Sequence, residues 1–112
     1  MTTKKLIYLA CPYKHEDPEV MQQRFEAVTK AAVELMAEGY LVFSPITHSH
    51  PMASRFNLPG GWDFWKEFDT AFLVTCDELH ILKLDGWEDS HGIAQETQMA
   101  KEWHMKVVYR EV

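Results

Sequence analysis

The segment 85–96, with the sequence DGWEDSHGIAQE, places Ser90, Gly92 and Glu96 between a predicted strand and a predicted helix. The first backbone N–H groups of a helix have no partner within it, and the helix dipole favours negative charge there. The Ser90 hydroxyl adds a donor, and Gly92 leaves room for a ligand against the backbone. Glu96 follows Ser90 by about 1.7 helical turns. This spacing indicates a nucleophile or base beside an anionic substrate, with a capped surface helix and a solvated Glu96 as the alternative.

Asp69 and Asp89 are further carboxylates that could act at the same site. Asp89 comes directly before Ser90, and Asp69 lies in the aromatic-rich segment 62–75, which we expect to be helical. Two carboxyl groups about 5 Å apart can divide glycosidic chemistry between a nucleophile and an acid. A solvated helix residue is the alternative interpretation of Asp69, because Asp is mostly exposed in folded proteins.

Two histidines, His48 and His50, lie in the segment 44–51 (SPITHSHP), which we expect to be a loop. Alternate residues of an extended loop point to opposite sides, and two histidines without a third nearby ligand make a weak zinc motif. His91 or a carboxylate would have to complete such a site in space. We therefore prefer contact with substrate, or packing within the loop, and expect neither a metal nor another cofactor.

Several aromatic side chains could form a surface on which a nucleobase stacks. Packing in the core or between subunits is the alternative, because aromatic residues dominate protein cores. The candidates are Tyr8, Tyr13, Trp62, Trp65 and Trp87.

The composition predicts one ordinary globular domain over residues 1–112, with 46% hydrophobic and 25% charged residues. The formal net charge of −6 argues against general binding to polymeric nucleic acid or to anionic membranes. No apolar run approaches the ~20 residues of a membrane-spanning helix, and a strand that begins at Leu6 leaves no signal peptide. Cys11 and Cys76 read as buried, reduced thiols, so we expect a cytoplasmic protein.

Motifs of other nucleotide and hydrolytic enzymes are missing from the sequence. It contains no GxxxxGK[ST], no GxGxxG and no GxSxG. Kinase, dinucleotide-dependent and α/β-hydrolase functions therefore lack support.

Strands and helices are predicted to alternate along the chain. Continuous apolar runs are typical of strands buried on both faces. Asp17 and Pro18 form a strong helix start, and Gly39 is typical of a helix end. The segment 52–61 lacks periodicity, so we expect a mobile excursion over the site. The predicted strands are 6–10, 40–43, 79–84 and 106–109, and the predicted helices are 17–38, 62–75 and 93–104.

This alternation predicts an α/β fold, a three-layer sandwich around a mostly parallel sheet of four to five strands, flavodoxin-like or Rossmann-like in arrangement. Ligands of such sheets bind beyond the carboxyl ends of the strands. Four segments should meet there: 11–16, 44–51, 85–92 and the tail after Tyr109.

Three motifs resemble the nucleoside 2-deoxyribosyltransferase-like superfamily, which includes the deoxynucleoside 5′-monophosphate N-glycosidases. They are YLACPY at 8–13, FSPITHSHP at 43–51 and DGWEDSHG at 85–92. The similarity is greatest to a small, largely uncharacterised domain family within that superfamily, and there it covers nearly the whole chain.

The resemblance implies catalytic roles for three side chains. Glu96 is similar in position to the nucleophilic Glu, four residues after the loop glycine Gly92. Asp69 matches an Asp that protonates or positions the base, eight residues before Asp77. Tyr8 matches a tyrosine near the sugar. We expect Asp69 to keep its proton, and Glu96, nearer a helix N-terminus, to be ionised.

The resemblance also implies a substrate-binding set. Ser90 matches a serine that contacts the 5′-phosphate, whereas transferases of free nucleosides tend to have Asp there. Because Asp89 is adjacent, the choice between nucleoside and monophosphate stays open. Pro12 and Tyr13 replace a glycine-rich loop, and the histidine motif has no assigned counterpart, so the base also stays open. The candidates are Pro12, Tyr13, His48, His50, Trp87, Asp89, Ser90 and Gly92.

The function that the resemblance implies is hydrolysis of an N-glycosidic bond, or (deoxy)ribosyl transfer, on a nucleoside or nucleoside 5′-monophosphate. The expected partners are that small molecule and further copies of the chain in a homo-oligomer. Two alternatives stay open. One is a catalytically silent nucleotide-sensing module, and the other is an interaction domain that reuses the fold.

Overall fold

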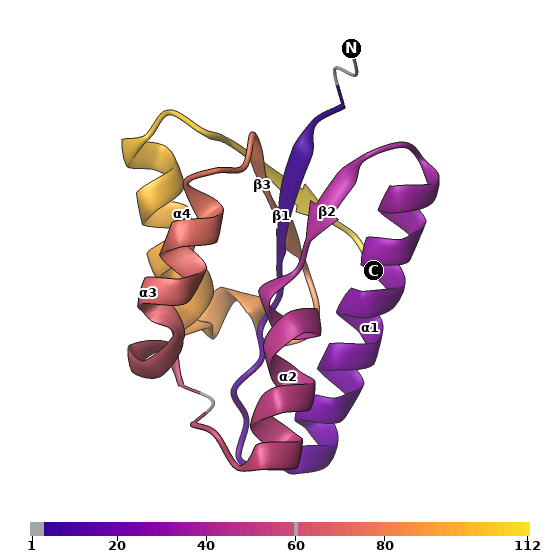
Figure 1. Cartoon of the computed structure of the whole chain (residues 1–112), viewed down its shortest axis with the longest axis vertical. Coiled ribbons are helices and arrows are strands. Elements are labelled where there is room, and N and C mark those ends of the chain that lie inside the picture. Colours follow the sequence, from indigo (N-terminus) through magenta and orange to yellow (C-terminus); the bar gives the residue numbers. More distant parts are fainter. Residues whose placement is uncertain (1–3, 60) are drawn as a thin grey trace.

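The computed structural model describes residues 4–59 and 61–112, which fold around a parallel four-stranded sheet. Helices cover both faces of this sheet (Figure 1), so the predicted three-layer α/β architecture is confirmed. The strands are β1 (Leu6–Ala10), β2 (Leu41–Phe43), β3 (Glu78–Leu82) and β4 (Lys106–Arg110), in the order β2-β1-β3-β4.

The helices form two groups, one on each side of the sheet (Figure 1). Helices α1 (Pro18–Ala37) and α2 (Pro45–Phe56) pack against each other on one side. Helices α3 (Trp62–Leu73) and α4 (His91–Glu102) lie on the other side, and the short 3₁₀ helix η1 (Trp87–Asp89) precedes α4. Parallel pairing requires the chain to return before each new strand, and α1, α3 and α4 are the helices that lead directly into β2, β3 and β4.

Strand β1 contributes to both hydrophobic clusters, because successive strand residues point to opposite faces. Tyr8 packs in the cluster that includes Leu73 of α3 and Ile93 of α4. Leu9 packs in the opposite cluster, with Val28 of α1. The side chain of Tyr8 therefore lies in the same layer as α3 and α4.

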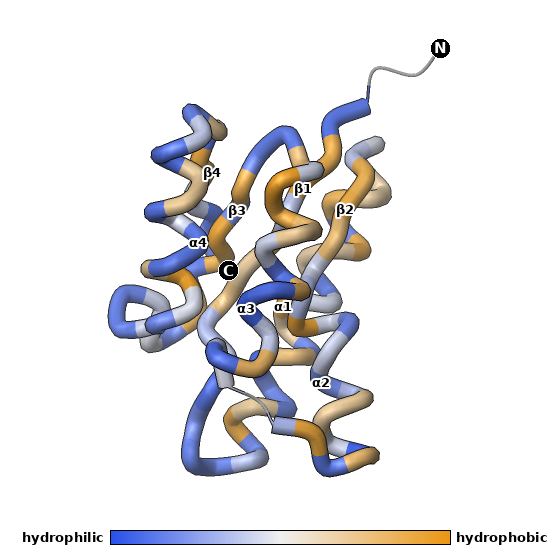
Figure 2. The backbone as a smooth tube through the Cα atoms, turned by 60° about the vertical axis from the view of Figure 1, so that its left-hand side comes forward, coloured by the Kyte–Doolittle hydropathy of each residue, from blue (hydrophilic) through white to orange (hydrophobic). Residues whose placement is uncertain are grey.

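The ends of α1 are those that the sequence predicted. The Asp17 side chain accepts a hydrogen bond from the Glu19 backbone N–H at 2.9 Å, and Pro18 occupies the first turn. Gly39, with φ of +103°, leads the chain away from the helix. Hydrophobic residues run along β1 and β2, whereas the helices mix hydrophilic and hydrophobic positions (Figure 2).

The predicted loop 44–51 is wrong, because this segment begins α2. The Ser44 hydroxyl accepts from the Thr47 backbone N–H at 3.2 Å, and Pro45 occupies the first turn, so the helix starts directly after β2. Pro51 lies inside the helix and hid its periodicity. Asn57, at φ of +58°, ends the helix.

The predicted mobile excursion 52–61 is also corrected in part. Residues 52–56 form the last turns of α2, and the connection to α3 is shorter than expected. Residue 60 of this predicted segment lies outside the described residues.

None of the helices in the described chain is both long and apolar enough to span a lipid bilayer.

Candidate functional site

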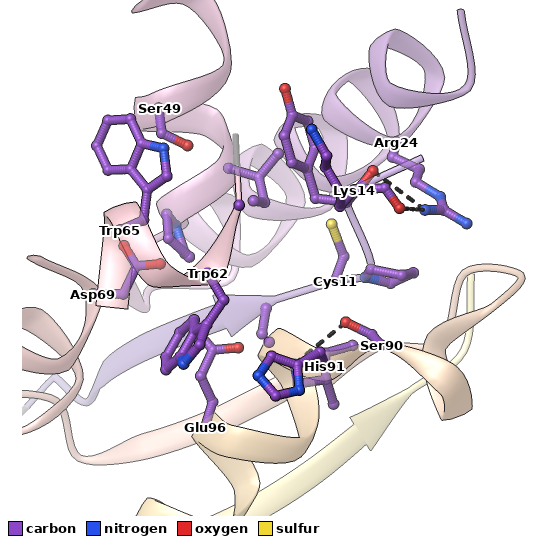
Figure 3. Close-up of a pocket in the computed structure, with 18 of the residues that line it drawn as sticks. Cys11, Lys14, Arg24, Ser49, Trp62, Trp65, Asp69, Ser90, His91 and Glu96 are labelled. Atoms are coloured by element: carbon purple, nitrogen blue, oxygen red, sulfur yellow. Dashed lines mark hydrogen bonds between the residues drawn. The ribbon is translucent and has the colours of Figure 1, made fainter. Parts of the chain in front are cut away.

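A pocket of about 470 Å³ opens at the carboxyl ends of the strands, where the fold predicts ligand binding. Its wall combines the segment after β1 with parts of α2, α3 and α4, so segments distant in sequence meet there. Figure 3 shows Ser49, Trp65 and Asp69 together on one side, with Lys14 and Arg24 on the opposite side. The predicted site residues in its wall are Pro12, Tyr13, Asp69, Asp89, Ser90, Gly92 and Glu96.

Ser90 sets the start of α4. Its side chain accepts a hydrogen bond from the Ile93 backbone N–H at 3.3 Å, and its backbone oxygen accepts from Ala94. A serine in this cap satisfies one otherwise unpaired donor. Glu96 follows in the second turn and is only 5% exposed, so the predicted alternative of a solvated Glu96 is wrong.

The Tyr8 hydroxyl lies 2.5 Å from Oε2 of Glu96, and both side chains are buried. Burial raises the pKa of Tyr8 well above its usual value, and the negative charge of Glu96 adds to the shift. Tyr8 therefore stays protonated and donates the hydrogen bond to the carboxylate. Tyr8 itself lies beneath the pocket, in contact with the side chain that lines it.

Burial raises the pKa of Glu96 to about 8; the nearby charge of Asp69 also raises it, while the hydrogen bond from Tyr8 opposes the shift. Burial likewise raises the pKa of Asp69, to about 7. The start of α4 therefore does not make Glu96 the more acidic member of the pair, contrary to the expectation from sequence. The reason is that Glu96 lies in the second turn, buried, where desolvation of the charge outweighs the dipole.

Asp69 projects from α3 into the pocket and is only 8% exposed. Its Oδ1 atom has no hydrogen-bond partner within the described part of the chain. A buried carboxyl oxygen without a partner is costly in a folded protein. Asp69 is therefore placed to donate a proton to, or accept one from, a molecule that enters the pocket.

Arg24 of α1 joins two rim segments, and sequence reasoning missed it. Its guanidinium donates to the backbone oxygen of Tyr13 at 3.2 Å and of Lys14 at 3.3 Å, and also to that of Asp85 at 3.0 Å. A side chain on Gly86 would meet Nη2 of Arg24 at 2.9 Å, and Gly86 has φ of +90°. Glycine suits this backbone conformation, which residues with a side chain rarely adopt, and no residue type in the sequence pointed to the contacts of Arg24.

Three of the predicted stacking aromatics line the pocket, namely Tyr13, Trp62 and Trp65. Trp62 lies beside α4, where a methyl group on Gly92 would approach its ring to 3.8 Å. Trp65 donates from Nε1 to the Pro59 backbone oxygen at 2.7 Å, which fixes its ring. Trp87 is not brought to this pocket; it packs against Tyr109, with ring centroids 5.5 Å apart.

The two histidines of α2 lie away from the pocket surface. His48 is exposed and stacks on Phe68, with ring centroids 5.0 Å apart. His50 is buried behind the wall, and its Nδ1 lies 2.6 Å from the Tyr13 hydroxyl. Ser49, between them, lines the pocket instead. Across residues 4–59 and 61–112, no group of three or more His, Cys, Asp or Glu side chains is placed to hold a metal ion.

Cys11 and Cys76 are buried and unpaired with each other, as the sequence predicted. Cys11 touches the pocket, but burial raises the pKa of its thiol far above neutral. A thiol that keeps its proton is a poor nucleophile, so the carboxyl groups are the stronger candidates for chemistry.

A family model described as a domain of unknown function, DUF1937, matches residues 5–111. No curated protein matches the chain.

Proposed function

The chain belongs to the DUF1937 family, and from this premise we propose that it cleaves the N-glycosidic bond of a nucleoside or nucleoside 5′-monophosphate. Cleavage would end either in hydrolysis or in transfer of the (deoxy)ribosyl group to a second base. The single observation that carries the proposal is the pair of buried carboxyl groups, Glu96 and Asp69, in one pocket with raised pKa values. Such pairs are typical of acid and nucleophile assignments in enzymes.

The proposed reaction proceeds through a covalent intermediate. An oxygen of Glu96 attacks the anomeric carbon as the bond to the base breaks, and Asp69 gives its proton to the departing base. Water, or a second base, then attacks the same carbon and releases Glu96, and the proton lost by this second nucleophile returns to Asp69. The pair must therefore hold one proton at the start and end with the same proton count. The reactive form carries this proton on Asp69, and the pKa values of about 7 for Asp69 and about 8 for Glu96 make it the less populated of the two singly protonated forms.

Tyr8 supports this distribution of charge. Its hydrogen bond at 2.5 Å favours the ionised form of Glu96 over the protonated form. Because Tyr8 contacts Oε2, the other carboxylate oxygen, Oε1, is the one we assign to the attack. The resemblance of the three motifs to the nucleoside 2-deoxyribosyltransferase-like superfamily supports the same roles for Tyr8, Asp69 and Glu96.

The start of α4 is the proposed place for an anionic substituent such as a 5′-phosphate. Ser90 and Gly92 line the pocket there, and the first N–H groups of a helix have no partner of the usual kind within it. The cationic side chains of Lys14 and Arg24 also line the pocket. Positive charge in the wall supports an anionic ligand in a protein whose net charge is −6.

A screen of nucleosides and nucleoside 5′-monophosphates, with chromatographic detection of free base, tests the proposal. The wild-type protein should release base from at least one compound, and Glu96→Ala should abolish release without abolishing binding. Glu102→Ala is the matched control, because Glu102 is exposed at the end of the same helix and should be dispensable. Binding without release by the wild-type protein would favour a nucleotide-sensing module, and neither binding nor release would favour an interaction domain.

We also propose that the chain forms a homo-oligomer. Large apolar side chains remain at the surface of the isolated chain, among them Phe56 (71% exposed), Phe64 (51%) and Phe72 (40%). Large apolar side chains at the surface are candidates for contacts between subunits. Light scattering at micromolar concentration should give a mass above the 13.1 kDa of one chain, and a monomer would contradict the proposal.

A further inference from the structure

Tyr13 is a pocket-lining residue that is held at both its backbone and its side chain. Its backbone oxygen accepts a hydrogen bond from Arg24 at 3.2 Å. Its hydroxyl lies 2.6 Å from Nδ1 of His50, and the two rings meet edge to face with centroids 5.5 Å apart. The segment after β1 thus depends on α1 for its backbone and on α2 for its aromatic side chain.

His50 is itself fixed by two residues of α1. The ring of Phe25 stacks on it, with centroids 4.5 Å apart and an interplanar angle of 27°. The Oε1 atom of Gln22 lies 2.8 Å from Nε2 of His50. His50 is only 6% exposed, and a neighbouring side chain lies within hydrogen-bond distance of each of its ring nitrogens. It does not line the pocket.

The hydrogen-bond partners determine which nitrogen of His50 carries the proton. The amide oxygen of Gln22 can only accept, so Nε2 must donate to it. Burial lowers the pKa of His50 and thereby favours the neutral ring, in which Nδ1 is then an acceptor. Burial raises the pKa of Tyr13, so its hydroxyl keeps the proton that it donates to Nδ1. Tyr13 therefore donates a hydrogen bond to His50, and His50 donates one to Gln22.

We propose that His50 is a positioning residue that holds the side chain of Tyr13 in the pocket wall and so sets the affinity for substrate. This inference rests on the proposed function only for the identity of the ligand. Without His50, the Tyr13 ring gains rotational freedom that substrate must remove on binding. Because the ring lies in the wall whether the substrate is bound or reacting, its loss should weaken ground-state and transition-state binding equally.

Kinetics of base release from a nucleoside 5′-monophosphate test this role. His50→Ala should raise KM about tenfold and leave kcat within about threefold, the pattern of lost uniform binding. Tyr13→Phe, which removes only the hydroxyl, should raise KM in the same direction, and the double variant should be no worse than His50→Ala. His50→Asn, whose amide oxygen can replace Nδ1 as acceptor, should recover part of the loss.

His80→Ala is the matched control, because His80 is also buried and hydrogen bonded, but its partners Glu78, at 2.8 Å, and Arg110 lie outside the pocket wall. It reports the effect of losing a buried histidine on stability alone, and its KM should stay within twofold of wild type. A KM within twofold of wild type in His50→Ala, or an equal rise in His80→Ala, would overturn the proposal.

Two measurements separate failure of this inference from failure of the proposed function. Long-range ¹H–¹⁵N spectra of the substrate-free protein should show His50 protonated at Nε2 and unprotonated at Nδ1, with the Nδ1 resonance shifted in Tyr13→Phe. A proton on Nδ1 would reverse the direction of the hydrogen bond, whereas an Nδ1 resonance that is unchanged in Tyr13→Phe would overturn the link whatever the activity. If the wild-type protein releases no base, the proposed function fails. Calorimetric titration of the same monophosphate into Glu96→Gln and Glu96→Gln/His50→Ala should still show the tenfold difference, and equal affinities would overturn the inference.

Discussion

The hydroxyl of Tyr8, on β1, lies 2.5 Å from Oε2 of Glu96, on α4, although 88 residues separate them in sequence. This contact gives a buried carboxyl group one donor that favours its ionised form. It opposes the burial and the nearby charge of Asp69, which both raise the pKa of Glu96. The balance between these effects determines the pH at which the proposed nucleophile is available.

Tyr8→Phe should lower kcat for base release by about 10- to 100-fold, because a hydrogen bond to a charged group contributes about 1.5–3 kcal/mol. The ring stays, so packing around β1 is preserved. The pKa of Glu96 should rise further without the donor, so the acidic limb of the rate profile should move to higher pH. An unchanged kcat and an unchanged limb would show that the contact has no catalytic role.

Asp69→Asn tests the proposed acid through the pH dependence of kcat/KM. The pKa values of about 7 for Asp69 and about 8 for Glu96 mean that the pair holds one proton between these pH values. Wild-type activity should therefore fall above pH 8, as the last proton leaves the pair. Asparagine keeps the shape but cannot titrate, so turnover should fall about 10²- to 10⁴-fold and the alkaline limb should flatten. Full activity with an unchanged profile would make Asp69 a structural residue.

Glu96→Gln should stabilise the protein increasingly as pH rises. The pKa of a Glu is about 4.3 in an unfolded chain, whereas that of Glu96 is about 8 in the folded protein. Between these values the unfolded chain releases a proton that the folded protein keeps, so wild-type stability falls with pH until about pH 8. The variant lacks this effect, so its Tm should exceed that of wild type by several degrees at pH 9 and by less at pH 5.

The matched control for this measurement is Glu102→Gln, an exposed position on α4. Its Tm difference from wild type should not widen with pH. If the Tm difference of Glu96→Gln also fails to widen with pH, burial of the Glu96 carboxyl group does not destabilise the folded protein. Glu96 would then not be a residue at which stability is lost for the sake of function.

Ser90→Asp should separate the capping role of Ser90 from its proposed role in anion binding. Asp caps helices as well as Ser does, so Tm should stay close to that of wild type. Its negative charge at the start of α4 should raise KM for a nucleoside 5′-monophosphate at least tenfold while changing KM for the free nucleoside little. Ser90→Ala should lose the cap, about 1 kcal/mol, with a smaller effect on discrimination. Equal KM changes for both substrates in Ser90→Asp would place the phosphate elsewhere.

The sheet and most helices could be predicted because their signals are local. Continuous apolar runs marked β1 and β3, and Asp17 and Gly39 marked the ends of α1. Helix α2 was missed because Pro51 interrupts its pattern, so the polar start after Ser44 read as a loop. There the cap and Pro45 outweigh the interruption.

The candidate site could be predicted only where a side chain carries its own signal. Ser90 and Glu96 follow a strand at helix spacing, and the structure places both in the pocket wall. The burial of Glu96 could not be read from sequence, since it comes from packing beside Tyr8 in three dimensions. Arg24 was missed because its partners are backbone oxygens, which any residue provides, and one of them lies 61 residues away.

The identity of the residue that becomes glycosylated tests the central claim most directly. A nucleoside analogue with 2′-fluorine slows both steps by destabilising the oxocarbenium-like transition state, so an intermediate should accumulate. Intact-mass and peptide mass spectrometry of the wild-type protein should then show one added glycosyl group, located on Glu96 and missing from Glu96→Gln. A modified residue other than Glu96, or release of base from a natural substrate with no glycosylated protein under any trapping condition, would contradict the account.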